Sequence, residues 1–183
     1  MRKKGPMSAL IFRFLAFSAL SAATIAGFGT VYADPDAVPT VVQVSQFSGK
    51  PVPRFESLRY SAVHGRQGPS LDHPILWRYE KQGLPMLIVR ETHGWRRVRD
   101  KDGDEVWMQA RMLSTDRTVI IIQDQTLFKR PDPASQGRAT LKAGLVAQLE
   151  KCEQGWCSVK IGRQSGWVTK AALWGVETAT GGL

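Results

Sequence analysis

The stretch GWRRV at residues 94–98 returns 61 positions later as GWCSV at residues 155–159. Other residues recur at similar spacings: Gly83 with Gly144, Trp107 with Trp167, Leu113 with Leu173 and, at a spacing of 64, Arg66 with Arg130 and Pro69 with Pro133. A period of about 60 residues indicates two tandem domains rather than a solenoid, whose repeats are shorter. The predicted organisation is a first domain at residues 54–114, a second at 115–176, a linker at 34–53 and a flexible tail at 177–183.

Each repeat has the pattern of short strands separated by glycine-containing turns. The strand-like segments are residues 84–89, 95–99 and 106–109 in the first repeat and residues 145–150, 157–161 and 167–169 in the second. The 183 residues include 17 glycines and 10 prolines, with no long helix-like run outside the N-terminus, which favours an all-β fold. About five strands in about 60 residues suggest a small barrel, and two such barrels gain stability by packing together.

The order of these motifs resembles that of the bacterial SH3-like domains, in particular the exported two-copy form found in proteobacteria. The resemblance covers residues 54–177. It is carried by RFESL at 54–58, VHGRQGPS at 63–70, the two GW motifs, GWV at 166–168 and ALWGV at 172–176. It implies two tandem small SH3-like β-barrels.

The first repeat departs from the family pattern at two places. His64-Gly65 stands where the family usually has Asn and an aliphatic residue, and Val106 stands where a glycine usually precedes the tryptophan. These departures bear on the ligand site of the first domain more than on the fold of that domain.

The first 33 residues have the pattern of an export signal. All charges of this region lie within residues 1–13, and FLAFSALSAATIAGFGTVYA at residues 14–33 has none. The end of this run fits a signal-peptidase site, so we expect cleavage after Ala33 and a periplasmic or secreted protein. The alternative is an uncleaved anchor, which would place the protein at the membrane, because 20 apolar residues are long enough to span a bilayer.

The two cysteines, Cys152 and Cys157, lie in the part of the chain that is expected to be exported. An oxidising compartment and an even count predict one disulfide between them. Their context, CEQGWC, places Gly155 in a tight turn, so the disulfide would join the two strands of a hairpin. The spacing is not that of a C-x-x-C redox pair, and two thiols alone do not complete a zinc site.

Charge and motifs argue against nucleic-acid binding and against catalysis. Lys and Arg number 25 against 16 Asp and Glu, but four of the basic residues precede Phe14, and without them the net charge falls from +9 to +5. The three histidines lie in the first repeat without an H-E-x-x-H spacing, and G-x-S-x-G, P-loop and dinucleotide fingerprints are absent. We therefore predict a protein that is not an enzyme and has no metal site or cofactor.

Strand alternation predicts which way the tryptophans point. Residues i and i+2 of a strand share a face. In the strand at 106–109, Val106 and Met108 are expected to point inward, which turns Trp107 outward. In the matching strand of the second repeat, Val168 is expected to point inward and Trp167 outward.

The same rule applies to the tryptophans of the GW motifs. Trp95 shares a face with Arg97, and Trp156 shares a face with Ser158, whereas Cys157 points inward. Large aromatic side chains on polar faces suggest a binding surface. The predicted ligand contacts are Trp95, Trp156, Trp107, Trp167 and Arg97. The alternative is that these indoles pack under loops or against the neighbouring domain, as we expect for Tyr60, Trp77 and Tyr79.

The resemblance implies a function for these residues. In related eukaryotic domains the tryptophan that corresponds to Trp95 and Trp156 lines a peptide groove, and bacterial SH3-like domains are commonly associated with cell-wall peptides. A basic, Trp-lined groove suits an extended peptide that carries free carboxylates. We therefore expect a module that recognises peptidoglycan peptide. The alternative is a scaffold that binds a periplasmic protein and no small ligand.

Overall fold

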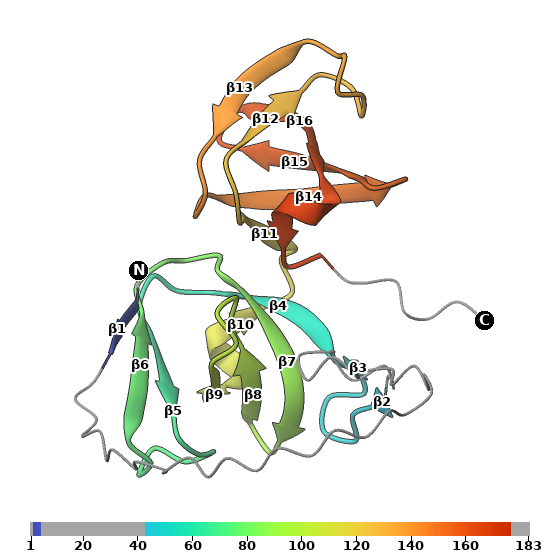
Figure 1. The fold of residues 1–183 in the computed structure, drawn as a ribbon. Helices are drawn as coiled ribbons and strands as arrows, with labels where there is room; N and C mark the ends of the chain where they lie inside the picture. The colour runs from blue at the N-terminus through green and yellow to red at the C-terminus, as the bar shows by residue number, and fades with distance from the viewer. Residues whose placement is uncertain (1, 5–42, 177–183) are drawn as a thin grey trace, which may run out of the picture.

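The computed structural model describes residues 2–4 and 43–176, which form two main antiparallel sheets and no α-helix. Figure 1 shows the two sheets as separate barrels, with β11 and β14 of the second domain nearest to the first. The all-β prediction is confirmed. Within the described residues no helix is long and apolar enough to cross a bilayer. The predicted cleavage site after Ala33 lies outside the described residues.

The first domain is an eight-stranded sheet with the order β1-β6-β5-β9-β8-β7-β4-β10. Its strands are β1 (Arg2–Lys4), β4 (Arg54–Leu58), β5 (Val63–Arg66), β6 (Ile75–Tyr79), β7 (Pro85–Thr92), β8 (Trp95–Arg99), β9 (Glu105–Gln109) and β10 (Leu113–Ser114). Its core includes Ile88, Val98, Val106 and Met108. The inward orientation expected of Val106 and Met108 is confirmed.

The second domain is a seven-stranded sheet with the order β13-β12-β16-β15-β14-β11-β17. Its strands are β11 (Thr118–Ile121), β12 (Gln125–Phe128), β13 (Gly137–Leu141), β14 (Val146–Glu153), β15 (Trp156–Ile161), β16 (Gln164–Thr169) and β17 (Leu173–Trp174). Its core includes Leu127, Cys157, Val159 and Val168, so Cys157 and Val168 point inward as expected.

Equivalent hydrogen bonds show how the two domains repeat. The amide of Ala110 donates to the carbonyl of Gly94, and the amide of Lys170 donates to the carbonyl of Gly155, at 2.8 Å in both cases. Since each bond joins the tip of a hairpin to a short 3-10 turn, Ala110–Met112 or Lys170–Ala172, the repeat extends from sequence to backbone contacts.

The strand register corrects one part of the sequence alignment. Arg66 pairs with Trp107 across β5 and β9, and Phe128 pairs with Trp167 across β12 and β16. Arg66 therefore corresponds to Phe128, and its alignment with Arg130 at a spacing of 64 is wrong. The loop that follows keeps the spacing of 62, because the amide of Gln67 donates to the carbonyl of Pro74 as the amide of Lys129 donates to that of Gln136. Pro69 therefore corresponds to Pro131 rather than to Pro133.

This register explains why the first repeat departs from the family pattern at both Gly65 and Val106. A Cβ atom on Gly65 would lie 2.6 Å from Cγ2 of Val106, so only glycine leaves room for that valine. At the equivalent positions of the second domain the sizes are exchanged: a Cβ on Gly166 would lie 2.7 Å from Cγ of Leu127. The two departures are therefore one coupled exchange of a small and a large side chain across a packed core.

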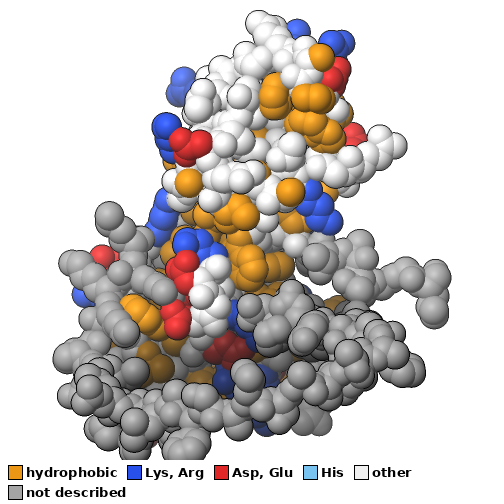
Figure 2. All heavy atoms as spheres, viewed as in Figure 1, with side chains coloured by type: hydrophobic (Ala, Val, Ile, Leu, Met, Phe, Trp, Pro, Cys, Tyr) orange, Lys and Arg blue, Asp and Glu red, His pale blue; other side chains and the backbone are white. Residues whose placement is uncertain are grey.

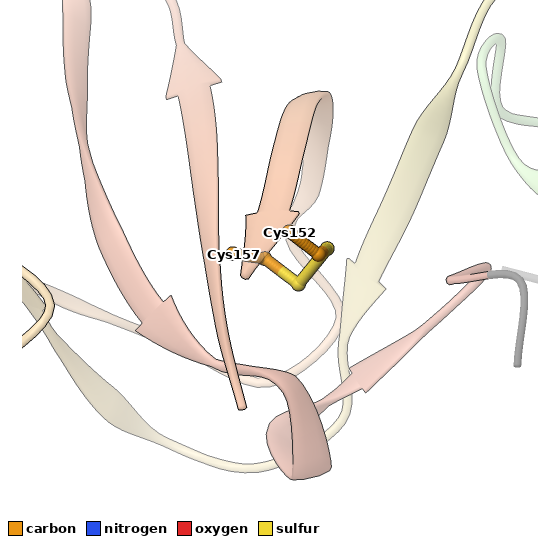
Figure 3. The surroundings of a disulfide bond; sticks show 2 residues. All are labelled: Cys152 and Cys157. Carbon is orange, nitrogen blue, oxygen red and sulfur yellow. A yellow bond between two sulfur atoms is a disulfide. The ribbon is translucent and has the colours of Figure 1, made fainter. Parts of the chain in front are cut away.

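The predicted disulfide is confirmed and joins β14 to β15. Cys152 and Cys157 are directly opposite each other, with Cα atoms 4.0 Å apart (Figure 3). The turn between them has positive φ at both Gln154 and Gly155, as in the type I′ turns that match the twist of a hairpin. The disulfide therefore closes a hairpin whose turn already brings its two strands together.

Removing this disulfide is expected to destabilise the second domain. Replacing Cys152 and Cys157 together by alanine opens a small loop, which the chain-entropy model values at about 2 kcal/mol. Urea unfolding of the wild-type protein and the double variant measures this difference. An unfolding curve unchanged by both the substitutions and a reducing agent would contradict it.

The two domains are joined by hydrogen bonds and by apolar contact. Thr118 at the start of β11 donates its hydroxyl to the carbonyl of Gly83 at 2.6 Å, and Ser57 in β4 donates to the carbonyl of Asp116 at 2.7 Å. The ring of Phe55 meets that of Trp174 edge to face, with centroids 5.3 Å apart. Figure 2 shows hydrophobic side chains gathered where the domains meet. The second domain is therefore packed on the first.

Candidate functional site

A row of four side chains crosses the first sheet on the face turned away from the core. Register pairs place Arg90 of β7 beside Arg97 of β8, Arg97 beside Trp107 of β9, and Trp107 beside Arg66 of β5. Trp107 therefore lies between arginines on both sides. We call these residues the first row.

The second sheet has an equivalent row. Lys151 of β14 pairs with Ser158 of β15, Ser158 with Trp167 of β16, and Trp167 with Phe128 of β12. We call these residues the second row. Both rows contain a tryptophan on the strand after the GW hairpin and a basic residue two strands away, so the repeat preserves a basic and aromatic face.

The four predicted tryptophans lie on these faces, and all of them are half-buried. Trp95 begins β8 and lies two residues from Arg97 on the same face, and Trp156 bears the same relation to Ser158 in β15. The structure thus brings the predicted residues together in two separate groups, one in each domain. Tyr60, which we expected to pack, is instead 49% exposed, so that expectation is wrong.

In the second domain the aromatic residues contact one another and a lysine. The rings of Phe128 and Trp156 meet edge to face at 5.7 Å, and Nζ of Lys151 lies 5.1 Å from the centroid of the Trp167 ring. Lys151 also pairs with Glu153 at 3.2 Å. The aromatic rings and the lysine of the second row are therefore already engaged in contacts within the domain.

In the first domain Trp107 lines a groove of about 530 Å³. Its other lining residues are Gln46, Phe47, Pro69, Arg90, Glu91 and Thr92. Phe47 is 43% exposed and lies in the tip between β2 (Gln43–Val44) and β3 (Pro51–Val52), a hairpin within the segment that we expected to be a linker. The groove is therefore formed jointly by this hairpin and by the first domain.

Charged residues differ in whether they are available in this groove. Arg97 pairs with Glu105 at 2.7 Å, so its charge is partly neutralised. Arg90 is exposed and has no carboxylate within salt-bridge distance among the residues that the structure describes. Arg66 donates to the carbonyls of Leu71 and His73, so its guanidinium is partly engaged as well. Among the described residues of the first row, Arg90 is therefore the cation that remains available to a ligand.

A buried ion cluster holds the hairpin against the sheet. The Glu91 carboxylate, whose side chain is 1% exposed, accepts hydrogen bonds from Arg54 at 2.5 Å and Ser48 at 2.6 Å and pairs with Arg96 at 2.9 Å. Arg54 also donates to the carbonyl of Pro51 at 3.0 Å. The cluster therefore joins the hairpin to β4, β7 and β8.

The surroundings of Glu91 lower its pKa. Burial alone raises it, but hydrogen bonds from Ser45, Ser48 and Arg54, together with the charge of Arg54, outweigh burial and hold the pKa of Glu91 below its ordinary value. Glu91 is thus ionised at neutral pH, and its charge is directed into the cluster rather than into the groove.

Sequence reasoning missed Arg90, Phe47, Lys151 and Phe128. The repeat itself contained a signal for the two cations, because Arg90 and Lys151 are 61 residues apart, the spacing of the GW motifs. Phe47 had no such signal, since it lies outside both repeats. In the described part of the chain, no three His, Cys, Asp or Glu side chains are grouped so that they could hold a metal ion.

Two small barrels, each with a basic and aromatic row, define a tandem of SH3-like domains. A family model described as Bacterial SH3 domain matches residues 60–115 and 123–175, and the chain belongs to this family. Bacterial SH3 domains are generally modules that bind the cell wall or other proteins.

No curated protein sequence matches the chain. Two solved structures from Trichomonas vaginalis are similar to it, NlpC2 and NlpC1, both at 14% identity, with TM-scores of 0.32 and 0.31. The matches cover 69% and 72% of this chain and 51% and 48% of those chains, so this chain spans about half the length of either protein.

Proposed function

We propose that this protein is an exported, non-catalytic module that binds cell-wall peptide through its two rows. The observation that carries the proposal is the repeated placement of a tryptophan and a basic residue on the same face of both sheets. An indole offers a flat apolar surface to a peptide, and a lysine or arginine binds its free carboxylates. The family membership supports a binding role of this kind.

The proposed location is the periplasm or the extracellular space. The signal-like sequence of residues 1–33 supports export, and the Cys152–Cys157 disulfide fits an oxidising compartment. An N-terminal segment that is retained would instead attach the module to the membrane. The function requires neither a cofactor nor nucleic acid.

Retention by purified peptidoglycan sacculi tests the proposal. We expect the chain from residue 34 onward, which lacks only the edge strand β1 of the first sheet, to sediment with sacculi. Trp107→Ala and Trp167→Ala are each expected to reduce retention by about tenfold. Retention of Trp95→Ala and Trp156→Ala shows whether the tryptophans that begin β8 and β15 also contact the ligand. Circular dichroism of every variant establishes that it is folded.

Tyr60→Ala is the matched control, since it also removes an exposed aromatic side chain but lies outside both rows. Equal losses for Tyr60→Ala and for the row variants would mean that the rows have no special role. Absence of wild-type retention would reject wall-peptide binding.

The second candidate is a scaffold for a periplasmic protein. The contact of Phe128 with Trp156 favours it, because aromatic residues satisfied within the domain leave less surface for a small ligand. If sacculi do not retain the wild-type protein, a protein partner becomes the preferred proposal. Cross-linking of the two rows to periplasmic proteins would then identify it.

A further inference from the structure

The groove of the first domain has two walls of different origin. Trp107 lies on the sheet, whereas Phe47 comes from the β2–β3 hairpin, more than 50 residues earlier in the chain. Pro69, from the loop after β5, lines the groove as well. Apolar groups on separate elements can enclose a side chain of an extended ligand, which a single flat sheet face does not do.

The free charge in this groove is positive. Glu91 borders the groove, but its carboxylate is engaged by Arg54, Arg96 and Ser48. Arg90 is next to it in sequence, yet its side chain is exposed and lacks a carboxylate partner within the described ranges. A ligand that enters the groove therefore meets an available guanidinium beside two aromatic rings, and a carboxylate is the group that complements it.

The hairpin wall is held in position without a ligand. Ser48, one residue after Phe47, donates to Glu91 at 2.6 Å, and the ring of Phe47 meets His93 edge to face at 6.0 Å. The amide of Ser45 donates to the carbonyl of Lys50 at 2.9 Å and closes the hairpin. Since the wall is already ordered, ligand binding does not have to order it, which favours affinity.

The second domain lacks two of these features. Lys151, at the position of Arg90, lies over Trp167 and pairs with Glu153, so its charge is already engaged. Between the end of β10 and the start of β11 the described chain has no hairpin comparable to β2–β3. The two repeats are therefore unequal as binding sites, although both carry the tryptophans.

We propose that the first domain and the β2–β3 hairpin form one composite peptide site. Phe47 and Trp107 enclose an apolar group of an extended peptide, and Arg90 binds a neighbouring free carboxylate. This inference rests on the proposed function for the source of the peptide, and it adds that the first domain is the main site and that the hairpin determines its specificity.

Titration with muropeptides tests this inference. The probe is the set of muropeptides that a muramidase releases from purified sacculi, used with free carboxylates and after chemical amidation of those carboxylates. Isothermal titration with the purified protein compares wild type, Phe47→Ala and Arg90→Gln. Arg78→Gln, on the exposed part of β6, is the matched control. Lys151→Gln, at the equivalent position of the second domain, compares the two rows.

We expect Arg90→Gln and Phe47→Ala each to weaken binding about tenfold, because each removes one main contact. Amidation of the probe weakens wild-type binding by the same factor and has little further effect on Arg90→Gln, since the carboxylate and the guanidinium are partners. Arg78→Gln binds as wild type does, and Lys151→Gln weakens binding less than Arg90→Gln does.

The possible outcomes of the titration distinguish a failure of this inference from a failure of the proposed function. If the wild-type protein binds but Arg90→Gln and Phe47→Ala bind equally well, the composite site is rejected, and sacculus retention still supports wall binding. If Lys151→Gln is the variant that loses binding, the second domain is the main site, and the inference is overturned. If no muropeptide binds, the composite site is rejected, and sacculus retention then decides the proposed function by itself.

Discussion

Gly65→Leu is expected to destabilise the first domain by about 2 kcal/mol or more, because the new side chain enters the space that Val106 occupies. Val106→Gly is expected to cost about 3 kcal/mol, since it leaves a cavity in the core and places glycine within a strand. Combined in one chain, the two changes reproduce the leucine and glycine of the second domain at Leu127 and Gly166. The double variant should therefore recover about half of the summed loss.

Urea unfolding of the four proteins in this cycle measures the coupling between the two positions. A favourable coupling of about 1–3 kcal/mol is expected for residues in direct contact. Strictly additive losses would show that the two positions are independent and that the exchange between the domains is coincidental. The reverse cycle, Leu127→Gly with Gly166→Val, examines the same contact in the second domain.

Glu91→Gln is expected to destabilise the protein by about 3 kcal/mol, because the largely buried Arg96 loses its carboxylate and Arg54 keeps only Glu56. The change keeps the shape of the side chain, so the loss reports on charge rather than on a cavity. The surface pair of Arg78 and Glu80 provides the control, since Glu80→Gln breaks an exposed pair in the same domain and should cost less than about 1 kcal/mol. Equal effects of the two variants would contradict a structural role for the cluster.

The pH dependence of stability gives the same cluster a second test. The pKa of Glu91 is lower in the folded than in the unfolded state, so its contribution is fully present above the unfolded pKa of about 4.3 and is lost as the pH falls through the folded pKa. The stability difference between wild type and Glu91→Gln should therefore shrink as the pH is lowered from 7 to 3. A difference independent of pH would show that ionised Glu91 is not the stabilising species.

The cluster occupies the position at which the second domain has its disulfide. Glu91 pairs with Arg96 across β7 and β8 at the position where Cys152 pairs with Cys157 across β14 and β15. The second domain thus joins its hairpin by a covalent bond, whereas the first domain uses an ion pair. Because a carboxylate accepts more than one hydrogen bond, only the first arrangement also holds the β2–β3 hairpin.

Much of the fold was available from local sequence patterns. The spacing of the GW motifs predicted two similar domains, and strand alternation predicted that Val106, Met108 and Val168 point into the cores. The short CEQGWC segment predicted the disulfide and its turn. Alternation and turn chemistry act between residues that are close in sequence, and the repeat can be found by comparing the chain with itself.

The missed features depend on contacts between distant residues. Arg54 and Glu91 are 37 residues apart, and nothing in the local pattern of either residue indicates the other. The prolines of residues 34–53 predict a linker, yet the ion cluster holds the hairpin that carries Phe47. Pairing across β5 and β9 showed that Arg66 corresponds to Phe128, where an alignment by residue type had selected Arg130.

By itself the sequence determined the class of this protein, the number of its domains, the disulfide and the faces that carry its tryptophans. Only the tertiary structure decided that Gly65 and Val106 form one coupled pair, that Arg90 is the available cation and that a hairpin outside both repeats completes the first groove. The physical reason is that strand alternation depends on neighbouring residues, whereas burial, ion pairing and the shape of a groove arise only when separate strands pack together.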